Sequence, residues 1–318
     1  MSPGTTHSAA PTRNILVPFN GTPASERALN YACRAFPSAD IVVLYVMSRE
    51  DEEASRGWVD SRDEFEEWVD ERREQARGDV FAEAHRIADR HDCTVSTELA
   101  VGDNVRGVVD YWNRHEFDFL VMSVRGRGLR QILRHLTGDL GGRMVRVSTI
   151  PAILVREDMD LPTERQSEAD RRILVPFDNS ERSRKALEFT CSLFPEADIT
   201  VLCMYVVWGS NQTVLLDEFD VENERMNEIH ATVDRIAAEQ ETTLDKVFGH
   251  GALDRAVLQY LERTPTDLVV TGTYGKATIS DLTMPSAAGR LVRDCPVPLA
   301  VVPAPYSGDF DVVRPELP

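Results

Sequence analysis

The sequence lacks long hydrophobic runs and an apolar N-terminal leader. No stretch approaches the roughly 20 apolar residues that a membrane-spanning helix needs. The longest apolar run, residues 41–47, has the length of a strand. Residues 1–12 are small and polar, without the apolar core of a secretory signal, so we expect them to form a disordered tail. These absences predict a cytoplasmic protein that does not associate with membranes.

Cysteine is scarce and unpaired. The five cysteines form no CxxC pair, which argues against a zinc site, so no metal site is expected. Their odd number fits reduced thiols in a reducing compartment. Free cysteines are more often core residues than reactive groups. The five are Cys33, Cys93, Cys191, Cys203 and Cys295.

Basic residues are few relative to acidic ones. The chain has 35 Lys and Arg against 53 Asp and Glu, a net charge of -18. Such a surface repels phosphates, which argues against general nucleic-acid binding. Two interpretations of the acidic excess stay open: an ordinary solvated surface, or a halophilic adaptation to a salty cytoplasm. In both cases high ionic strength would screen the repulsion.

The strongest feature that the sequence does have is an internal repeat. Residues 15–19, Ile-Leu-Val-Pro-Phe, recur as residues 173–177, an offset of 158 (173 minus 15). The offset shortens along the chain as loop lengths change, but the order of matches is preserved. Such collinearity indicates two diverged copies of one domain. Matched pairs include Cys33 with Cys191 at offset 158, Asp118 with Asp267 at 149, and Gly142 with Gly289 at 147.

Each copy alternates short apolar runs with segments of helical period. This alternation predicts an α/β fold with a mostly parallel, five-stranded sheet covered by helices on both faces. The expected strands of copy 1 are residues 14–18, 41–46, 94–100, 117–121 and 150–155, and copy 2 ends with a strand at 297–302. The expected organisation is a tail (1–12), domain 1 (13–157), a polar linker (158–170), domain 2 (171–304) and a C-terminal tail (305–318).

Helix signals in copy 1 are equally specific. Thr22 is a candidate N-cap with Pro23 at the first helical position. A long charged helix is expected over residues 60–90, and further helices over 104–114 and 140–147. The first helix should bury one apolar stripe: Ala28, Leu29, Ala32, Cys33 and Phe36.

Parallel sheets of this kind bind ligands outside the carboxyl ends of their strands, where the winding direction switches. The loops that follow strands one and four are therefore the candidate sites. They cover residues 19–22 and 123–128 in copy 1, and 177–180 and 272–276 in copy 2.

These loops resemble those of the universal stress protein family over almost the whole chain. Family members open with a strand ending in Val-Pro-x-Asp-Gly-Ser, whose acid holds the nucleoside of ATP, and their fourth strand leads into a phosphate loop, G-x2-G-x9-G-[ST]. Glycines let the loop backbone approach phosphate, and the following helix N-terminus supplies positive potential. The resemblance implies two Rossmann-like domains of the adenine nucleotide alpha hydrolase type.

Copy 2 keeps more of this pattern than copy 1. Its loop has both early glycines and the serine, but Pro285 replaces the last glycine, and Asn179 replaces the glycine after the acid. Asp178 has a competing interpretation as a helix cap, and the glycines as residues of a tight turn. By resemblance, the nucleotide-binding residues of domain 2 are Pro176, Asp178, Val206, Gly272, Gly275 and Ser286.

Copy 1 departs further from the pattern. Asn20 replaces the acid, Ser123 replaces the first glycine, and Asp139 stands where a hydroxyl would meet phosphate. Six arginines nevertheless gather between residues 121 and 146, which fits either an anion site or a salt-bridged contact surface. The candidate anion-binding residues of domain 1 are Asn20, Arg125, Gly126, Arg127 and Gly138.

The prediction is a tandem universal stress protein that acts in stress response or signalling and binds ATP, with Mg²⁺, or a related adenine nucleotide in domain 2. The alternative is a nucleotide-free interaction module, which the departures from the motif favour. No carboxylate dyad, Ser-His-Asp order or metal cluster supports an enzyme, although slow ATP hydrolysis stays open. By resemblance, the fifth strands of the two domains pair antiparallel as an intrachain pseudo-dimer, and two chains form a homodimer.

Overall fold

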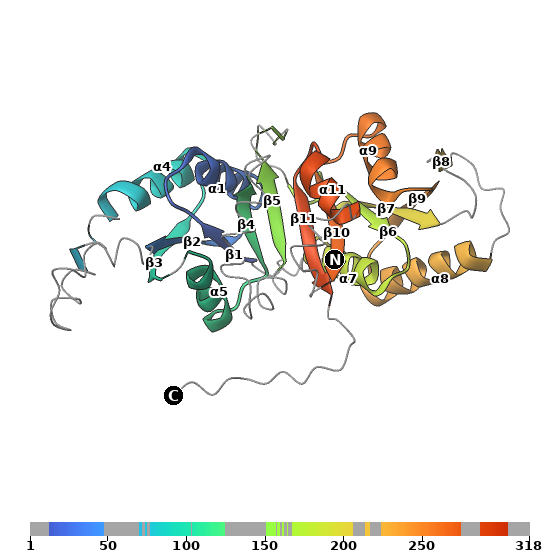
Figure 1. The fold of residues 1–318 in the computed structure, drawn as a ribbon, viewed down its shortest axis with the longest axis horizontal. Coiled ribbons are helices and arrows are strands. Elements are labelled where there is room, and N and C mark those ends of the chain that lie inside the picture. Colours follow the sequence, from blue (N-terminus) through green and yellow to red (C-terminus); the bar gives the residue numbers. More distant parts are fainter. Residues whose placement is uncertain are drawn as a thin grey trace, which may run out of the picture.

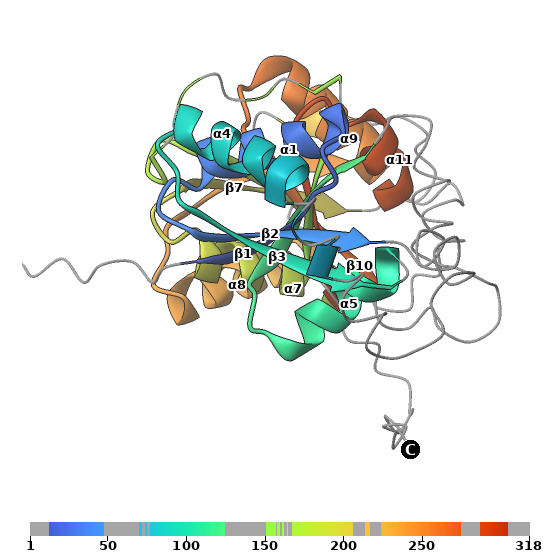
Figure 2. The same ribbon diagram turned by 90° about the vertical axis from the view of Figure 1, so that its left-hand side faces the viewer.

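The computed structural model consists of two α/β domains that share one continuous sheet (Figure 1). Helices cover both faces of this sheet, as expected (Figure 2). The structure describes residues 13–47, 70–71, 74, 77–102, 104–124, 151–156, 158–159, 161, 164, 167–205, 214–216, 224–274 and 287–304.

Domain 1 contributes five parallel strands in the order β3-β2-β1-β4-β5. The chain winds from β1 outward to β3 and then returns to the other side of β1, so the winding direction switches between β1 and β4. The five expected strands are confirmed, with small shifts at their ends. Their bounds are β1 (Asn14–Pro18), β2 (Asp40–Met47), β3 (Val95–Val101), β4 (Phe119–Val124) and β5 (Ala152–Arg156).

Domain 2 repeats this order and adds one strand. Its parallel strands follow the order β11-β10-β6-β7-β9, and the short β8 (Val214–Leu216) pairs antiparallel with the outer edge of β9. β8 was not expected from the sequence, because three residues are too few for a recognisable period. The other strands are β6 (Arg172–Phe177), β7 (Asp198–Tyr205), β9 (Leu244–His250), β10 (Leu268–Tyr274) and β11 (Leu299–Ala304).

The two sheets join through their fifth strands, as the family resemblance implied. β5 and β11 run antiparallel, with Ile153 opposite Ala300 and Leu154 opposite Leu299. This pairing satisfies backbone groups along two edges that would otherwise be open to other chains. Within the described residues, the result is an 11-stranded sheet built from one chain.

Each face of the sheet carries helices from both domains, because residues paired across the antiparallel β5 and β11 lie on the same face. α1 (Pro23–Ala35) and α4 (Ala82–Arg90) share one face, and one hydrophobic core, with α7 (Glu181–Leu193) and α8 (Glu224–Glu239). α9 (Leu253–Arg263) and α11 (Ala287–Asp294) pack on the other face, as does α5 (Asn104–Arg114) of domain 1.

The start of α1 follows the sequence prediction. Thr22 is the N-cap and accepts a hydrogen bond from the Ser25 amide, and Pro23 occupies the first turn. The predicted apolar stripe is buried, with no member more than 2% exposed. All five cysteines are buried and none is in a disulfide, which agrees with their interpretation as core residues.

The long charged helix is only partly described. Its C-terminal part is a π-helical turn, η1 (Arg77–Phe81), that continues into α4. Ala84 is fully buried, as predicted, and Val80 packs against the core. The helix expected over residues 140–147 lies outside the described residues.

Two equivalent arginines, Arg13 and Arg171, bind across the interface between the two domains. Arg171, only 2% exposed, donates to the Ala35 carbonyl, and its guanidinium carbon lies 4.5 Å from the ring centre of Phe36. Arg13, its counterpart at offset 158 (171 minus 13), donates from Nε to the Leu193 carbonyl at 2.9 Å. Buried guanidinium groups that stack on aromatic rings attract them strongly, because little water competes. The two arginines therefore add to the strand pairing in holding the domains together.

Candidate functional site

The carboxyl ends of β1 and β4, and of β6 and β10, face each other at the switch points of the sheet. In domain 2 the β6–β10 pairing ends at Leu174 opposite Val269, and the strands separate beyond it. Pro176 follows within two residues and is buried, paired in register with Leu202 of β7. Proline has no amide hydrogen, and its position suits a strand that has left one of its neighbours.

Asp178 and its counterpart Asn20 form the same local turn after the first strand. The Asp178 Oδ1 accepts a hydrogen bond from the Ser180 amide at 3.1 Å, and the Asn20 Oδ1 accepts from the Thr22 amide at 3.3 Å. Such turns are typical of Asp and Asn just before a helix. The N-cap of α7 is Ser180, not Asp178, so the interpretation of Asp178 as the cap is wrong in detail. Asp178 instead positions the residue that caps.

Asp178 carries a negative charge at neutral pH. Burial alone would raise its pKa, but hydrogen bonds from Ser180 and Ser183 and the nearby Arg182 guanidinium outweigh that effect, so the pKa lies below its ordinary value. The side chain is only partly buried and follows β6 directly, beyond the point where β6 and β10 cease to pair. A charged carboxylate in this position can accept hydrogen bonds from hydroxyl groups of a ligand.

Packing alone explains why position 272 is a glycine. A Cβ built on it would overlap the backbone carbonyl of Arg182 and lie 2.9 Å from the Arg182 Cβ, so the first turn of α7 sits directly on this end of β10. Only glycine permits this approach. Close packing thus brings Gly272 beside the start of α7, a few residues from Asp178, whatever further role its backbone has.

Domain 1 is different at the matching position. Ser123 stands where Gly272 stands in domain 2 (272 minus 149), and its buried Oγ has no hydrogen-bond partner among the described residues. A buried hydroxyl without a partner is unfavourable. The first loop of domain 1 therefore keeps the turn at Asn20, while its second strand end differs from that of domain 2.

The remaining predicted site residues lie outside the described residues. These are Val206, Gly275 and Ser286 of domain 2 and Arg125, Gly126, Arg127 and Gly138 of domain 1. Strand register adds one detail for the β2 position: Pro18 pairs with Leu44 and Pro176 with Leu202. Two residues further on, Val46 corresponds to Met204, which precedes Val206 by two positions.

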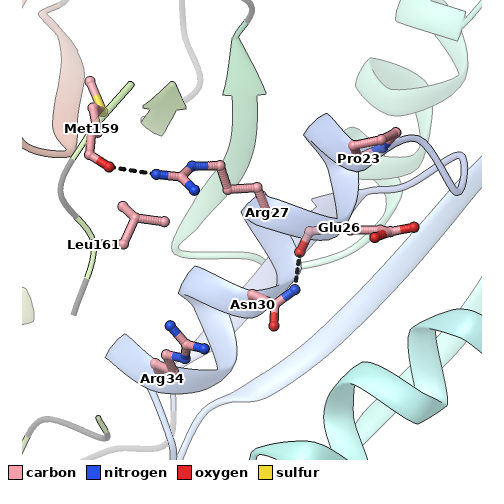
Figure 3. A pocket seen from close by; sticks show the side chains of 7 residues that line it. All are labelled: Pro23, Glu26, Arg27, Asn30, Arg34, Met159 and Leu161. Atoms are coloured by element: carbon pink, nitrogen blue, oxygen red, sulfur yellow. Dashed lines mark hydrogen bonds between the residues drawn. The ribbon is translucent and has the colours of Figure 1, made fainter. Parts of the chain in front are cut away.

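A pocket of about 490 Å³ lies along α1, beside the linker and not at the strand ends (Figure 3). Two of its polar side chains bond within the protein: Arg27 donates to the Met159 carbonyl, and Asn30 donates to the Glu26 carbonyl at 2.7 Å. It is therefore a pocket between α1 and the linker, separate from the predicted nucleotide site. It is lined by Pro23, Glu26, Arg27, Asn30, Arg34, Met159 and Leu161.

Two contacts around α11, the helix that begins directly after Ser286, were not expected from the sequence. Arg290 of α11 forms a bidentate ion pair with Asp254 of α9, at 2.5 Å from Nε and 2.8 Å from Nη2. Arg156 of domain 1 donates from Nη1 to the Val292 carbonyl of α11 at 3.0 Å. Neither pair has a sequence signal, because the partners are 36 and 136 residues apart.

Within the described residues, no helix is long and apolar enough to cross a membrane. The same residues contain no group of three or more side chains suited to hold a metal ion.

Comparison with known proteins agrees with the architecture. A universal stress protein of Methanocaldococcus jannaschii is 26% identical over 141 residues, 42% of this chain and 83% of that protein. The crystal structure of a universal stress protein from Archaeoglobus fulgidus matches 92% of this chain and 96% of its own, with a TM-score of 0.62 at 17% identity. A family protein from Arabidopsis thaliana with AMP bound matches 42% of this chain and 92% of its own, with a TM-score of 0.26 at 12% identity.

The family model matches the chain twice. The model of the universal stress protein family covers residues 11–156 and again residues 170–303. These two matches coincide with the two halves of the shared sheet, each with its own switch point. The chain therefore belongs to the universal stress protein family, as a tandem member with two domains.

Proposed function

We propose that the protein is a stress-response or signalling protein that binds ATP or a related adenine nucleotide in domain 2, while domain 1 is its structural partner. Asp178 carries this proposal, because it is the charged acceptor at the switch point of domain 2 and its counterpart Asn20 is neutral. The ligand class follows from the motif and from family members such as the Arabidopsis protein with AMP bound.

The nucleotide site would draw on three parts of domain 2. The carboxylate of Asp178 would accept hydrogen bonds from the ribose hydroxyls. The loop after β10, with Gly275 and Ser286, would meet the phosphates, and the N-terminus of α11 would add positive potential. With ATP, a Mg²⁺ ion would accompany the phosphates and offset their charge. The protein would then be a cytoplasmic nucleotide sensor that associates as a homodimer.

A nucleotide-free interaction module is the second candidate. Pro285 removes one amide hydrogen from the expected phosphate loop, and domain 1 places Ser123 and Asp139 where the motif has glycine and a hydroxyl. The packing of Gly272 against Arg182 also favours this candidate, because it explains that glycine without any ligand.

Calorimetric titration with ATP and Mg²⁺ tests the proposal, with the wild type and Asp178→Asn compared at low and high salt. Asparagine is the sharp substitution, because Asn20 shows that it forms the same turn. Asp178→Asn therefore removes the charge and keeps the loop. The wild type is expected to bind with micromolar affinity, about -8 kcal/mol, and the variant at least tenfold more weakly.

Asn20→Asp is the matched control, since it adds a carboxylate at the equivalent position of domain 1. It should leave ATP affinity within twofold of the wild type if domain 2 holds the site. A gain in affinity or a second binding event would move the site to domain 1. No binding by the wild type at either salt concentration would favour the interaction module.

A further inference from the structure

α11 is the helix whose N-terminus would face the phosphates, so its position decides how its amides meet the ligand. The helix has only eight residues, Ala287–Asp294. A short helix has little stability of its own and depends on contacts with its surroundings. Figure 1 shows α11 over β11, beside the seam with β5 of domain 1.

The C-terminal end of α11 has a missing donor. The Val292 carbonyl would ordinarily accept the amide four residues later, but that residue is Pro296, which has no amide hydrogen. Arg156 supplies the donor from domain 1, with its Nη1 at 3.0 Å from the Val292 carbonyl oxygen. A cation at this end also complements the helix dipole.

Arg156 is itself held in place. Its side chain is 4% exposed, and its Nε and Nη2 donate to the two oxygens of Asp158 at 2.8 and 3.1 Å. Its carbonyl accepts from Arg27 Nε of α1 at 2.9 Å. Because these contacts hold the Arg156 guanidinium in place, its hydrogen bond to the Val292 carbonyl anchors the end of α11 to domain 1.

A second contact orients α11 from within domain 2. Asp254, 6% exposed at the first turn of α9, binds Arg290 of α11 through both carboxylate oxygens. Bidentate pairs of this kind fix direction as well as distance. α11 is thus held along its length by α9 and at its end by Arg156.

The equivalent residues of domain 1 cannot form either contact. At the offsets of the repeat, Pro303 corresponds to Arg156 (303 minus 156 is 147) and Val105 to Asp254 (254 minus 105 is 149). Strand register agrees, because Val124 pairs with Arg156 and Thr273 with Pro303. Thr149, which has an amide hydrogen, corresponds to Pro296. Only domain 2 combines the missing donor with the arginine that replaces it.

We propose that Arg156 of domain 1 is a positioning residue for the nucleotide site of domain 2, because it holds α11 so that its N-terminus meets the phosphates. This inference rests on the proposed function. It gives domain 1 a defined part in binding, although its own loop departs from the motif. In this arrangement the phosphates of the nucleotide meet the N-terminus of α11, whereas the nucleoside is held by the loop at Asp178.

The test compares the affinities of ATP and adenosine in the full chain by calorimetry. Arg156→Met keeps much of the side-chain volume and removes the donor. It should weaken ATP binding about tenfold and leave adenosine binding within twofold, because adenosine has no phosphate. Arg156→Lys, which restores a cation and a donor, should recover part of the ATP affinity. Arg293→Met is the matched control, because it also removes one positive charge near the C-terminal end of α11. The Arg293 side chain is 63% exposed and pairs with Asp294.

The outcomes separate the inference from the proposed function. Equal losses for ATP and adenosine in Arg156→Met would show a general structural effect and overturn the inference. Unchanged ATP affinity in that variant, or an equal loss in Arg293→Met, would overturn it while the proposed function stands. A wild-type protein that binds neither ligand would overturn both.

Discussion

Gly272→Ala is the substitution with the clearest physical consequence. The added methyl group would overlap the Arg182 carbonyl, which is backbone in the first turn of α7 and has no rotamer through which to move away. Either α7 or β10 must shift, and Thr271 and Thr273 on either side of Gly272 are buried. Overpacking of this kind costs about 1–3 kcal/mol. A loss of about 2 kcal/mol would lower the melting temperature by roughly 4–8 °C.

Thermal and urea unfolding of the full chain would measure this effect. Gly78→Ala is the control, because a Cβ at Gly78 meets nothing within 4 Å and alanine favours a helix over glycine. It should be neutral or slightly stabilising. Gly272→Ser introduces the residue that domain 1 has at Ser123, and it should destabilise at least as much as alanine. A melting temperature of Gly272→Ala equal to that of the wild type would refute the packing argument.

Three further predictions concern Arg171 at the domain interface, the Asp254–Arg290 ion pair and two buried thiols. Arg171→Met should lower the free energy of unfolding by about 2–4 kcal/mol, since it leaves the Ala35 carbonyl without its donor and removes the contacts with Phe36 and Phe194. Urea unfolding measures this, and Arg235→Met, an exposed α8 pair with Glu239, should change stability by less than about 0.5 kcal/mol. Burial raises the pKa of Asp254, but the hydrogen bond and charge of Arg290 outweigh this effect, so the pKa lies below its ordinary value. The stabilisation is therefore present above the unfolded pKa and lost as pH falls through the folded pKa. Asp254→Asn should melt lower than the wild type at pH 7, and melting curves that keep this gap unchanged at pH 3 would contradict the assignment. Burial raises the pKa of Cys203 to about 12 and that of Cys191 to about 11, so a thiol reagent at pH 8 should modify these two only after unfolding. Rapid modification of either in the native protein, located by mass spectrometry, would contradict their burial.

The fold could be predicted because its signals are local and occur twice. Each buried strand is a short apolar run, and the start of α1 has a capping residue followed by proline, so both can be recognised without knowledge of the partners. The repeat then supplied the second domain. The β5–β11 pairing came from the family resemblance, and the structure shows it with Ile153 opposite Ala300.

The site could be predicted only in part. Asp178 was identified by its motif, but the identity of the α7 cap was not, because Asp178 and Ser180 are both residue types that cap helices. The packing role of Gly272 depends on where α7 lies, and that position is a property of the folded chain. Arg156 was assigned no role, because it follows a strand and its contact with Val292 lies across the domain boundary. Hydrophobic periodicity shows which face of an element is buried and does not identify a polar partner in the other domain.

The differences between the two copies form a consistent pattern. Domain 1 lacks the acid after its first strand and the glycine near the end of its fourth, yet it has the turn at Asn20 and the arginine, Arg13, that binds domain 2. The shared features stabilise the fold and the interface, and the features that domain 1 lacks are those that the motif assigns to a ligand. In addition, Arg156 supplies a donor that Pro296 of domain 2 cannot. A domain that keeps its structural contacts, lacks the acid and glycine of the motif and contacts α11 of its neighbour fits the proposed part of Arg156 in supporting that helix.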